Sequence, residues 1–256
     1  MRSSRVLRKL RSGGIATSFK LNLADARAAE IAAMSGFDCI WTCMEHTPND
    51  WAVIEKQILA GKAYDVDTVV RVSRGGYSDY IRPLEADAAG IMVPHIMSIK
   101  QAEEVVRMTR FHPIGRRPLD GGNADGDYCL MPLVDYCEKA NRERFVILQI
   151  EDPEPMEELE AIASLDGYDM LFFGPADFSQ GLGALGEWNH PAISDARKRI
   201  AEACVSAGKY AGTVGNPANV QELVDMGYRF INIGADVLGL SQYCKDMLAS
   251  VADIQI

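Results

Sequence analysis

The feature that most constrains the fold of this chain is an alternation of short apolar runs with longer amphipathic segments along its whole length. Eight apolar runs have the length and content of buried strands, and they lie at residues 14–19, 39–45, 68–72, 90–95, 145–151, 170–174, 210–214 and 230–233. Segments with helical spacing lie between or beside them, near 3–12, 25–34, 50–61, 77–88, 98–109, 131–142, 155–164, 192–207, 217–226 and 237–250.

Strands that alternate with helices pair in parallel, and eight such units within 256 residues predict a closed (β/α)8 TIM barrel, which is an α/β fold. We interpret residues 1–256 as a single barrel domain, although two domains of ordinary size would also fit this length. A doubly wound open sheet is the alternative fold. It normally carries a glycine-rich phosphate motif after an early strand, and no GxGxxG motif follows an early strand here.

Composition argues against several classes of partner. The formal net charge of -10 disfavours binding to nucleic acid or to an anionic membrane surface through bulk electrostatics. The six cysteines form no CxxC pair and are scattered among apolar segments, which is typical of reduced thiols in a cytoplasmic protein. No apolar stretch reaches the length of a transmembrane helix. We therefore expect a soluble, cytoplasmic protein that acts on small molecules.

Two carboxylates follow buried strands at positions where they can converge. The run at 145–150 ends at Glu151, and the run at 170–173 is followed by Gly-Pro and then by Asp177. Pro175 cannot donate to a sheet ladder, so this strand should end near residue 174 and leave the amides of Ala176 and Asp177 facing outward. The alternative is that Asp177 only caps the helix that follows.

Other polar side chains also stand at predicted strand ends, where the active sites of such barrels lie. Arg71 ends the third strand, and Gln149 lies two residues before Glu151, so that both point to the same side of their strand. Polar groups inside an apolar run need partners. A buried ion pair with Arg71 is the structural alternative, but several polar strand ends on one rim are more typical of an active site.

Two carboxylates on a water-accessible rim suit a hard divalent cation such as Mg²⁺ or Mn²⁺. The sequence has neither an HExxH motif nor cysteine and histidine residues at zinc-ligand spacing, so a structural zinc is not predicted. Three of the four histidines, His95, His112 and His190, adjoin prolines. This leaves His46 as the predicted general base, because it directly follows Glu45 at a strand end.

Taken as a set, several short motifs resemble those of the HpcH/HpaI aldolases, the metal-dependent class II pyruvate aldolases. Members of that family include 4-hydroxy-2-oxoheptanedioate and 2-keto-3-deoxy-sugar-acid aldolases. The resemblance covers nearly the whole chain and rests on residues 29–38, 45–49, 70–71, 93–94, 113–117, 149–151 and 173–177.

The resemblance implies a lyase that cleaves a 4-hydroxy-2-oxo acid into pyruvate, or a related 2-oxo acid, and an aldehyde through a metal-bound enolate. It implies that Glu151 and Asp177 ligate the divalent metal, which is Mg²⁺ or Mn²⁺, with Co²⁺ also compatible. Gln149 and the amides of Ala176 and Asp177 would then hold the substrate carboxylate. It also implies a homo-oligomer, specifically a hexamer.

The resemblance further implies that Arg71 stabilises negative charge at the keto oxygen and that His46 takes the proton of the C4 hydroxyl. The sequence departs from the family pattern at Cys43, where an aspartate normally pairs with the histidine, and at Glu85, where an aspartate is usual. Cys43, Glu45 and Glu85 are therefore expected to act around the catalytic pair. A thiol in place of the carboxylate predicts a weaker base at His46.

Other functions stay open at this point. An oxaloacetate decarboxylase would use the same enolate, and the change at Cys43 is also compatible with a barrel that binds a metal and a 2-oxo acid without catalysis. A lyase of CoA esters, related to the citrate lyase β subunit, is a third alternative. The sequence offers no spare domain or basic surface for the CoA moiety, which disfavours this alternative.

Overall fold

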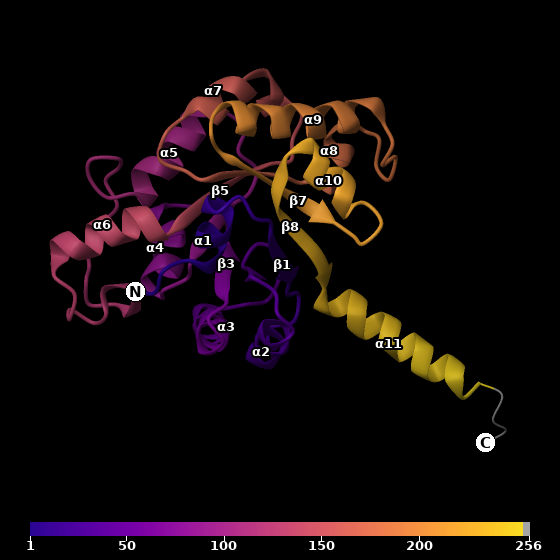
Figure 1. Ribbon diagram of the computed structural model, residues 1–256, viewed down its shortest axis with the longest axis horizontal. Coiled ribbons are helices and arrows are strands. Elements are labelled where there is room, and N and C mark those ends of the chain that lie inside the picture. Colours follow the sequence, from indigo (N-terminus) through magenta and orange to yellow (C-terminus); the bar gives the residue numbers. More distant parts are fainter. Residues whose placement is uncertain (253–256) are drawn as a thin grey trace.

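The computed structural model describes residues 1–252, and within them eight parallel strands form a closed barrel in chain order. The strands are β1 (Ala16–Lys20), β2 (Cys39–Cys43), β3 (Asp67–Arg71), β4 (Gly90–Val93), β5 (Phe145–Ile150), β6 (Met170–Phe173), β7 (Tyr210–Gly215) and β8 (Tyr228–Ala235). Pairing of β8 with β1 closes the barrel, which Figure 1 shows surrounded by helices. The predicted (β/α)8 barrel is confirmed.

The helices lie close to the predicted segments. They are α1 (Arg5–Arg11), α2 (Ala26–Met34), α3 (Trp51–Ala63), α4 (Tyr77–Glu85), α5 (Ile99–Thr109), α6 (Leu133–Glu143), α7 (Leu159–Ser164), α8 (Pro175–Gly181), α9 (Pro191–Ser206), α10 (Val220–Met226) and α11 (Asp236–Ser250), with 3-10 turns η1 (Ala124–Gly126) and η2 (Glu154–Glu157). The helix expected near 155–164 is divided between η2 and α7, and the short helix α8 was not predicted. Across residues 1–252, no helix is both long enough and apolar enough to span a membrane.

Large apolar side chains fill the interior of the barrel. Trp41, Phe172 and Phe230 come from β2, β6 and β8 and meet edge to face, with ring centroids 5.3 Å apart for the first pair and 6.3 Å for the second. Met92 and Ile147 are fully buried in the same cluster. Because this interior is a packed core, a ligand must bind at an end of the barrel.

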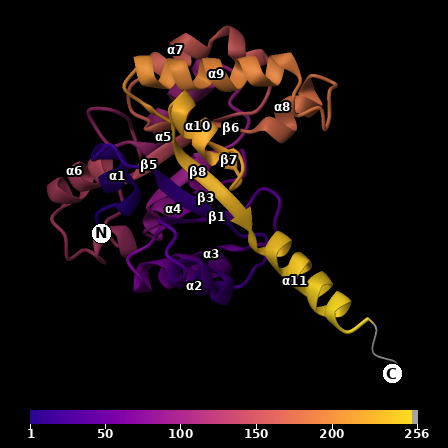
Figure 2. The same ribbon diagram turned by 45° about the vertical axis from the view of Figure 1, so that its right-hand side comes forward.

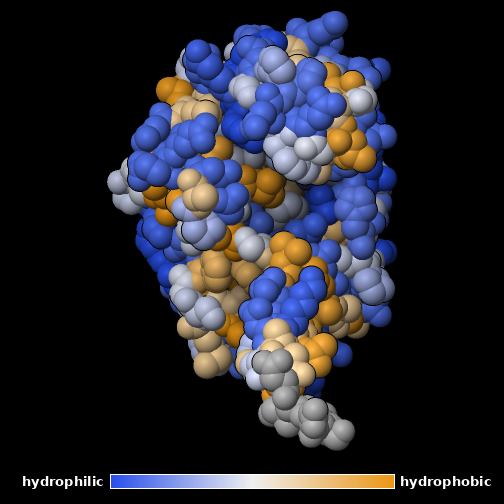
Figure 3. Space-filling view, turned by 90° about the vertical axis from the view of Figure 1, so that its right-hand side faces the viewer, coloured by the Kyte–Doolittle hydropathy of each residue, from blue (hydrophilic) through white to orange (hydrophobic). Residues whose placement is uncertain are grey.

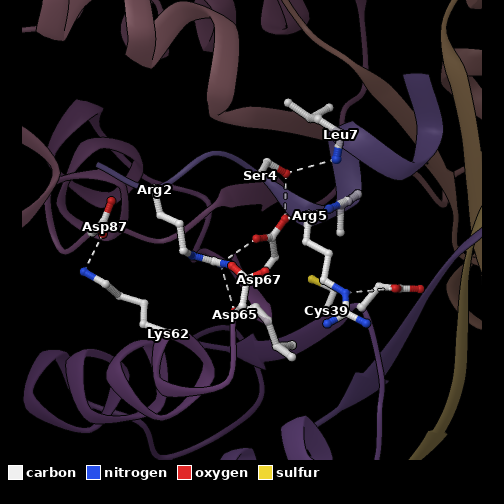
Figure 4. Close-up of polar contacts among 12 residues, drawn as sticks. Arg2, Ser4, Arg5, Leu7, Cys39, Lys62, Asp65, Asp67 and Asp87 are labelled. Carbon is white, nitrogen blue, oxygen red and sulfur yellow. Dashed lines mark hydrogen bonds and ion pairs between the residues drawn. The ribbon is translucent and has the colours of Figure 1, made fainter. Parts of the chain in front are cut away.

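The amino-terminal segment closes the amino end of the barrel, and Figure 4 shows polar contacts made by this segment. Helix α1 buries Val6, Leu7 and Leu10 against the interior cluster. Asp67, the first residue of β3, accepts hydrogen bonds from Arg2 Nη2 and from Ser4 Oγ, both at 2.6 Å, and from the Val6 amide at 2.8 Å. This buried polar network leaves the carboxyl end as the open end of the barrel.

Helix α11 follows β8 and projects away from the barrel, as Figures 1 and 2 show. Asp236, its first residue, accepts hydrogen bonds from the amides of Asn22 and Leu23, which ties the start of the helix to the end of β1. The part of α11 that the structure describes buries none of its side chains. In Figure 3, which faces the side from which α11 projects, hydrophobic residues gather around the base of this helix.

Candidate active site

The carboxyl ends of β5 and β6 bring three polar side chains together. Gln149 lies on β5 and Glu151 directly follows it, and they are 2% and 1% exposed. The Gln149 Nε2 atom donates a hydrogen bond to Glu151 Oε2, whereas no described residue donates to the buried Gln149 Oε1. Asp177 lies in the first turn of α8, with a carboxylate oxygen within 4.8 Å of one from Glu151.

Helix α8 places Asp177 because its sequence favours a helix start at this point. Pro175 occupies the first helical position, where its missing N–H group costs no hydrogen bond. Gly174 allows the preceding strand to approach β5 closely, since a Cβ atom at this position would lie 2.6 Å from Glu151 Oε2 and 3.1 Å from Gln149 Nε2. The amides of Ala176 and Asp177 lie in the first turn, where helix N–H groups have no intrahelical acceptor.

A second group of side chains comes from the ends of β2 and β3. Arg71 is 4% exposed, and its Nε atom lies 3.0 Å from Glu45 Oε2. Its Nε and Nη2 atoms both lie 3.3 Å from Cys43 Sγ. The thiol at position 43 therefore contacts the guanidinium group. His46 contacts this thiol through its backbone amide, at 3.4 Å, and not through its ring.

His46 has one carboxylate neighbour, Glu45, but no hydrogen bond joins the two side chains within the described residues. Its Nε2 atom lies 3.3 Å from Glu45 Oε2, and its side chain is 55% exposed. The acid comes from the adjacent residue in the bend after β2 and is shared with Arg71. The acid nearest to the His46 ring is therefore Glu45, and Cys43 contacts only the backbone of His46.

The structure adds His95, which follows Pro94 and was not a predicted site residue. His95 comes directly after β4, and its Nδ1 atom lies 2.8 Å from Asp152 Oδ2. The opposite ring nitrogen, Nε2, lies 3.7 Å from Glu151 Oε1 and 3.8 Å from Glu45 Oε1. The imidazole therefore lies between the two groups of side chains. Its position at a strand end was the signal in the sequence that could have identified it.

Lys20 is a further cation that the sequence analysis did not select. It is the last residue of β1, and its Nζ atom lies 5.2 Å from the centroid of the Trp41 ring, the same ring that the Arg71 guanidinium approaches to 5.1 Å. Burial, together with the charge of Arg71, lowers the pKa of Lys20. Two cations thus line one side of the barrel mouth.

Glu85 is not brought to this site, in contrast to its predicted role beside the catalytic pair. It is the last residue of α4, and the charged groups around it are Arg82, Arg117, Asp120 and Asp125. Because α4 begins beyond the carboxyl end of β3 and runs back along the barrel, its last residue lies away from the strand ends.

Burial is the main influence on the pKa of Glu151. It raises the pKa of Glu151 to about 7, and the charge of Asp177 acts in the same direction, whereas His95 and Arg71 oppose the rise. Burial by itself would lower the pKa of His95, but the hydrogen bond to Asp152 and the neighbouring carboxylates outweigh it and raise that pKa. The site therefore favours a positive charge near Glu151.

Three side chains at this position have the donor atoms of a metal site. One ligand atom each from His95, Glu151 and Asp177 lies within 4.8 Å of the other two. A cation between them would offset the repulsion between two carboxylates, one of which is fully buried. Carboxylate oxygens and an imidazole nitrogen are common ligands of divalent metals.

Comparison with known proteins identifies the family. The profile described as HpcH/HpaI aldolase/citrate lyase matches residues 18–242. The chain belongs to this family. A crystal structure of an HpcH/HpaI aldolase/citrate lyase family protein from Burkholderia cenocepacia covers 98% of the chain and all of its own length (100%), with 32% identity and a TM-score of 0.90.

Two relatives of this chain in the HpcH/HpaI family carry names of aldolases. A hydroxypyruvate/pyruvate aldolase from Paraburkholderia phytofirmans is 34% identical over 90% of the chain and 91% of its own length. A 2-keto-3-deoxy-L-rhamnonate aldolase from Salmonella schwarzengrund is 30% identical over 96% of the chain and 92% of its own length. Together with the family match, these relatives identify the chain as an enzyme of the class II aldolase type.

Proposed function

We propose that the enzyme cleaves a 4-hydroxy-2-oxo acid into pyruvate, or a related 2-oxo acid, and an aldehyde. The observation that carries this proposal is the convergence of two carboxylates, Glu151 and Asp177, with the buried guanidinium of Arg71 at the open end of the barrel. The names of the relatives, which act on pyruvate, hydroxypyruvate or a keto-deoxy sugar acid, agree with this substrate class.

Glu151 and Asp177 are the metal ligands in this proposal, and Mg²⁺ or Mn²⁺ is the expected ion. The site fits a cation because Glu151 is buried with a raised pKa and because Gly174 keeps the space beside it free of a side chain. A bound divalent ion would act as a Lewis acid that stabilises negative charge on the oxygen of the substrate carbonyl.

Gln149, Ala176 and Asp177 bind the substrate carboxylate in our assignment. Gln149 directs a buried amide group toward Glu151, and the first-turn amides of α8 offer N–H donors beside it. An anion at such donors is favoured by the partial positive charge at the start of a helix. These contacts would orient the 2-oxo acid with its carbonyl oxygen toward Arg71.

Arg71 stabilises the charge that develops on the carbonyl oxygen during cleavage. Glu45 and Cys43 hold its guanidinium at 3.0 Å and 3.3 Å, so the group needs little reorganisation when the charge appears. The arginine and the cation together supply the electrostatic stabilisation that other aldolases obtain from a lysine Schiff base.

His46 takes the proton from the C4 hydroxyl in this scheme. The Glu45 carboxylate lies 3.3 Å from Nε2 of this imidazole. Exposure of the His46 side chain lets it exchange its proton with solvent after each turnover.

We further propose that the enzyme acts as a homo-hexamer in the cytoplasm, where its free cysteines stay reduced.

Exchange of the methyl protons of pyruvate in deuterated water tests the proposal without knowledge of the aldehyde. We expect exchange that depends on added Mg²⁺ or Mn²⁺ and that falls at least about a hundredfold in Glu151→Gln. Glu103→Gln, which neutralises an exposed acid on α5, is the control and should keep full activity. Absence of exchange in the metal-loaded wild type would indicate a barrel that binds without catalysis.

A panel of substrates separates aldol cleavage from the related decarboxylation. We expect release of pyruvate from at least one 4-hydroxy-2-oxo acid. Exchange of pyruvate protons together with turnover of oxaloacetate alone would identify a decarboxylase, because that reaction needs no base for a hydroxyl proton. Turnover of malyl-CoA alone would favour a CoA-ester lyase.

A further inference from the structure

We propose that His95 is a third protein ligand of the metal and that it makes this site prefer a transition-metal ion such as Co²⁺ over Mg²⁺. The inference rests on the proposed function, since it takes Glu151 and Asp177 as the two carboxylate ligands. It goes further by assigning a nitrogen ligand, a partner that orients this ligand and a metal preference.

The direction of the imidazole is the first observation that supports this assignment. The Nε2 atom lies 3.7 Å from Glu151 Oε1, and with a carboxylate oxygen of Asp177 it belongs to a set of ligand atoms within 4.8 Å of one another. Two ligands of one ion, each about 2.1 Å from it, are separated by about 3 to 4 Å. The three side chains therefore need only small rotations to share one ion.

Asp152 supplies the partner that a metal-bound histidine usually has. Its Oδ2 atom lies 2.8 Å from Nδ1 of His95, so Nδ1 carries the proton that is donated to it and the lone pair of the neutral ring is on Nε2. A carboxylate that accepts from one ring nitrogen while the other binds the ion is the common arrangement around metal-bound histidines.

The backbone also fixes His95 relative to Glu151. The amide of His95 donates a 3.0 Å hydrogen bond to Glu151 Oε1, and the residue has a φ of 50°, a conformation that is uncommon for residues other than glycine. The residue that contacts Glu151 through its amide thus also has an unusual backbone conformation. Such conformations cluster at functional sites, where the surrounding structure over-determines them.

Gln149 gives an independent indication that a ligand belongs here. Its side chain is 2% exposed, yet its Oε1 atom has no hydrogen-bond donor among residues 1–252. Its Nε2 atom donates a hydrogen bond to Glu151, which places the amide group beside the three candidate ligands. A buried acceptor without a donor is costly, and a water molecule held by a metal ion would satisfy it.

The chemistry of the ligands determines the metal preference. Mg²⁺ favours oxygen ligands in a near-octahedral arrangement, whereas an imidazole nitrogen favours the later first-row ions, with affinity rising from Mn²⁺ through Co²⁺ to Ni²⁺. An additional nitrogen ligand should therefore strengthen binding of Co²⁺ far more than binding of Mg²⁺. The alternative is that His95 is a protonated ion-pair partner of the carboxylates, which would not favour either ion.

Calorimetric titration of the full-length protein with CoCl₂ and with MgCl₂ tests the preference. In His95→Gln we expect the Co²⁺ affinity to fall at least about tenfold and the Mg²⁺ affinity to change less than about threefold. Asp152→Asn should lower the Co²⁺ affinity about 10- to 100-fold through loss of the orienting partner. His112→Gln, which changes an exposed histidine, is the matched control and should alter neither affinity.

Pulsed electron paramagnetic resonance on the Mn²⁺-loaded wild type gives a second readout that does not depend on the folding of a variant. We expect a ¹⁴N coupling from a directly bound imidazole, and its loss in His95→Gln where that variant folds. Absence of the coupling in the wild type would overturn the assignment of His95.

The two failures are distinguishable. If Glu151→Gln loses metal binding but His95→Gln keeps the wild-type ratio of Co²⁺ to Mg²⁺ affinity, the proposed function stands and the role of His95 is refuted. If the wild type binds neither ion, the proposed function and the role of His95 are both refuted.

Discussion

Arg71 is a buried cation whose neighbours hold it in one orientation. Its guanidinium contacts Glu45 and Cys43 and lies 5.1 Å from the centroid of the Trp41 ring. We predict that Arg71→Lys lowers kcat/KM for aldol cleavage at least about a hundredfold, because lysine keeps the charge but loses the planar fork that reaches the carbonyl oxygen and Glu45 together. Steady-state kinetics measure this loss, and near-normal kcat/KM in a folded variant would remove Arg71 from the catalytic site.

Glu45 is predicted to be needed for proton transfer because it is the acid that contacts His46. Glu45→Gln keeps the volume but removes the carboxylate charge beside His46 and Arg71, so aldol cleavage should slow at least about a hundredfold. Decarboxylation of oxaloacetate should lose less activity, since it removes no hydroxyl proton. Equal losses in the two assays would show that Glu45 acts mainly through Arg71.

Binding of the metal should depend on pH through Glu151. Burial holds the pKa of this acid at about 7 in the metal-free protein, so below that pH a proton must leave before a cation can bind. We therefore predict that metal affinity increases as the pH rises through about 7, and loss of the proton from His95, whose pKa is also raised, acts in the same direction. Calorimetry in buffers of different ionisation enthalpy counts the released protons, and an affinity that is constant between about pH 6 and about pH 8 would contradict the prediction.

The same elevated pKa affects stability with a definite sign. Because the folded state binds this proton more tightly than the unfolded chain, the contribution of Glu151 to the free energy of unfolding decreases as the pH rises from 4.5 to about 7. The metal-free protein should therefore lose stability over this range. Glu151→Gln should remove that part of the loss.

Single residues show where sequence reasoning reached its limit at the site. Polar side chains at strand ends could be selected from the pattern alone, because a carboxylate after an apolar run is conspicuous. His95 could not be chosen over the other histidines, because its proposed role as a ligand depends on Asp152 and Glu151. These two acids follow β5 and lie beside His95 only in the folded barrel. The sequence showed that His46 follows Glu45, but the 3.3 Å approach of their side chains depends on the bend after β2.

Among the elements, the junction between β6 and α8 leaves little room for a side chain at Gly174. We predict that Gly174→Ala lowers metal affinity at least about tenfold, because the added Cβ would lie 2.6 Å from Glu151 Oε2 and force this acid to move. The backbone itself tolerates alanine, as its φ is -101°. Calorimetry with Mn²⁺ measures the loss.

Gly76→Ala is the control for this close approach. A Cβ atom at Gly76 would have no neighbour within 4 Å, and its φ of -85° is also accessible to alanine. This variant should bind metal as the wild type does. If Gly174→Ala also binds metal normally, Glu151 has room to move and the junction does not determine the geometry of the site.

Hydrophobic periodicity predicted the strands well because each strand of a parallel barrel is buried on both faces and forms a continuous apolar run. The ends were less exact. The first strand was expected at 14–19 and lies at Ala16–Lys20, which moves Lys20 onto the strand end. Helix α8 was not predicted because its seven residues are too few to show a repeated hydrophobic pattern and begin with proline.

At the scale of the whole molecule, the two ends of the barrel differ. A buried polar network closes the amino end, whereas the candidate active site lies at the carboxyl end. At the amino end, Asp67 and Asp38 bind the segment that carries Arg2, Arg5 and Lys9 across the barrel floor, as Figure 4 shows in part. At the carboxyl end the buried polar groups include an acceptor without a donor within the described part of the chain. Gln149 Oε1 is this acceptor, and it lies beside Glu151 at the open end of the barrel, where a ligand can reach it.

Helix α11 carries the prediction about assembly. Leu240, Tyr243 and Met247 are 52%, 62% and 47% exposed and recur at helical spacing on one face, while the helix projects away from its own barrel. An apolar face of this kind needs a partner surface. We predict that α11 packs against another subunit in a homo-oligomer, with a hexamer as the expected state.

Light scattering of the wild type and of two variants tests this prediction. Leu240→Glu combined with Met247→Glu places charges on the apolar face and should shift the protein toward smaller species at micromolar concentration. Lys245→Glu changes the charge at an exposed position on the opposite side of the same helix and should leave the mass unchanged. Because these positions are exposed in the single chain, loss of assembly should not unfold the barrel, which circular dichroism can verify. A wild-type protein that is monomeric at micromolar concentration would refute the prediction, and the apolar face of α11 would then require another partner.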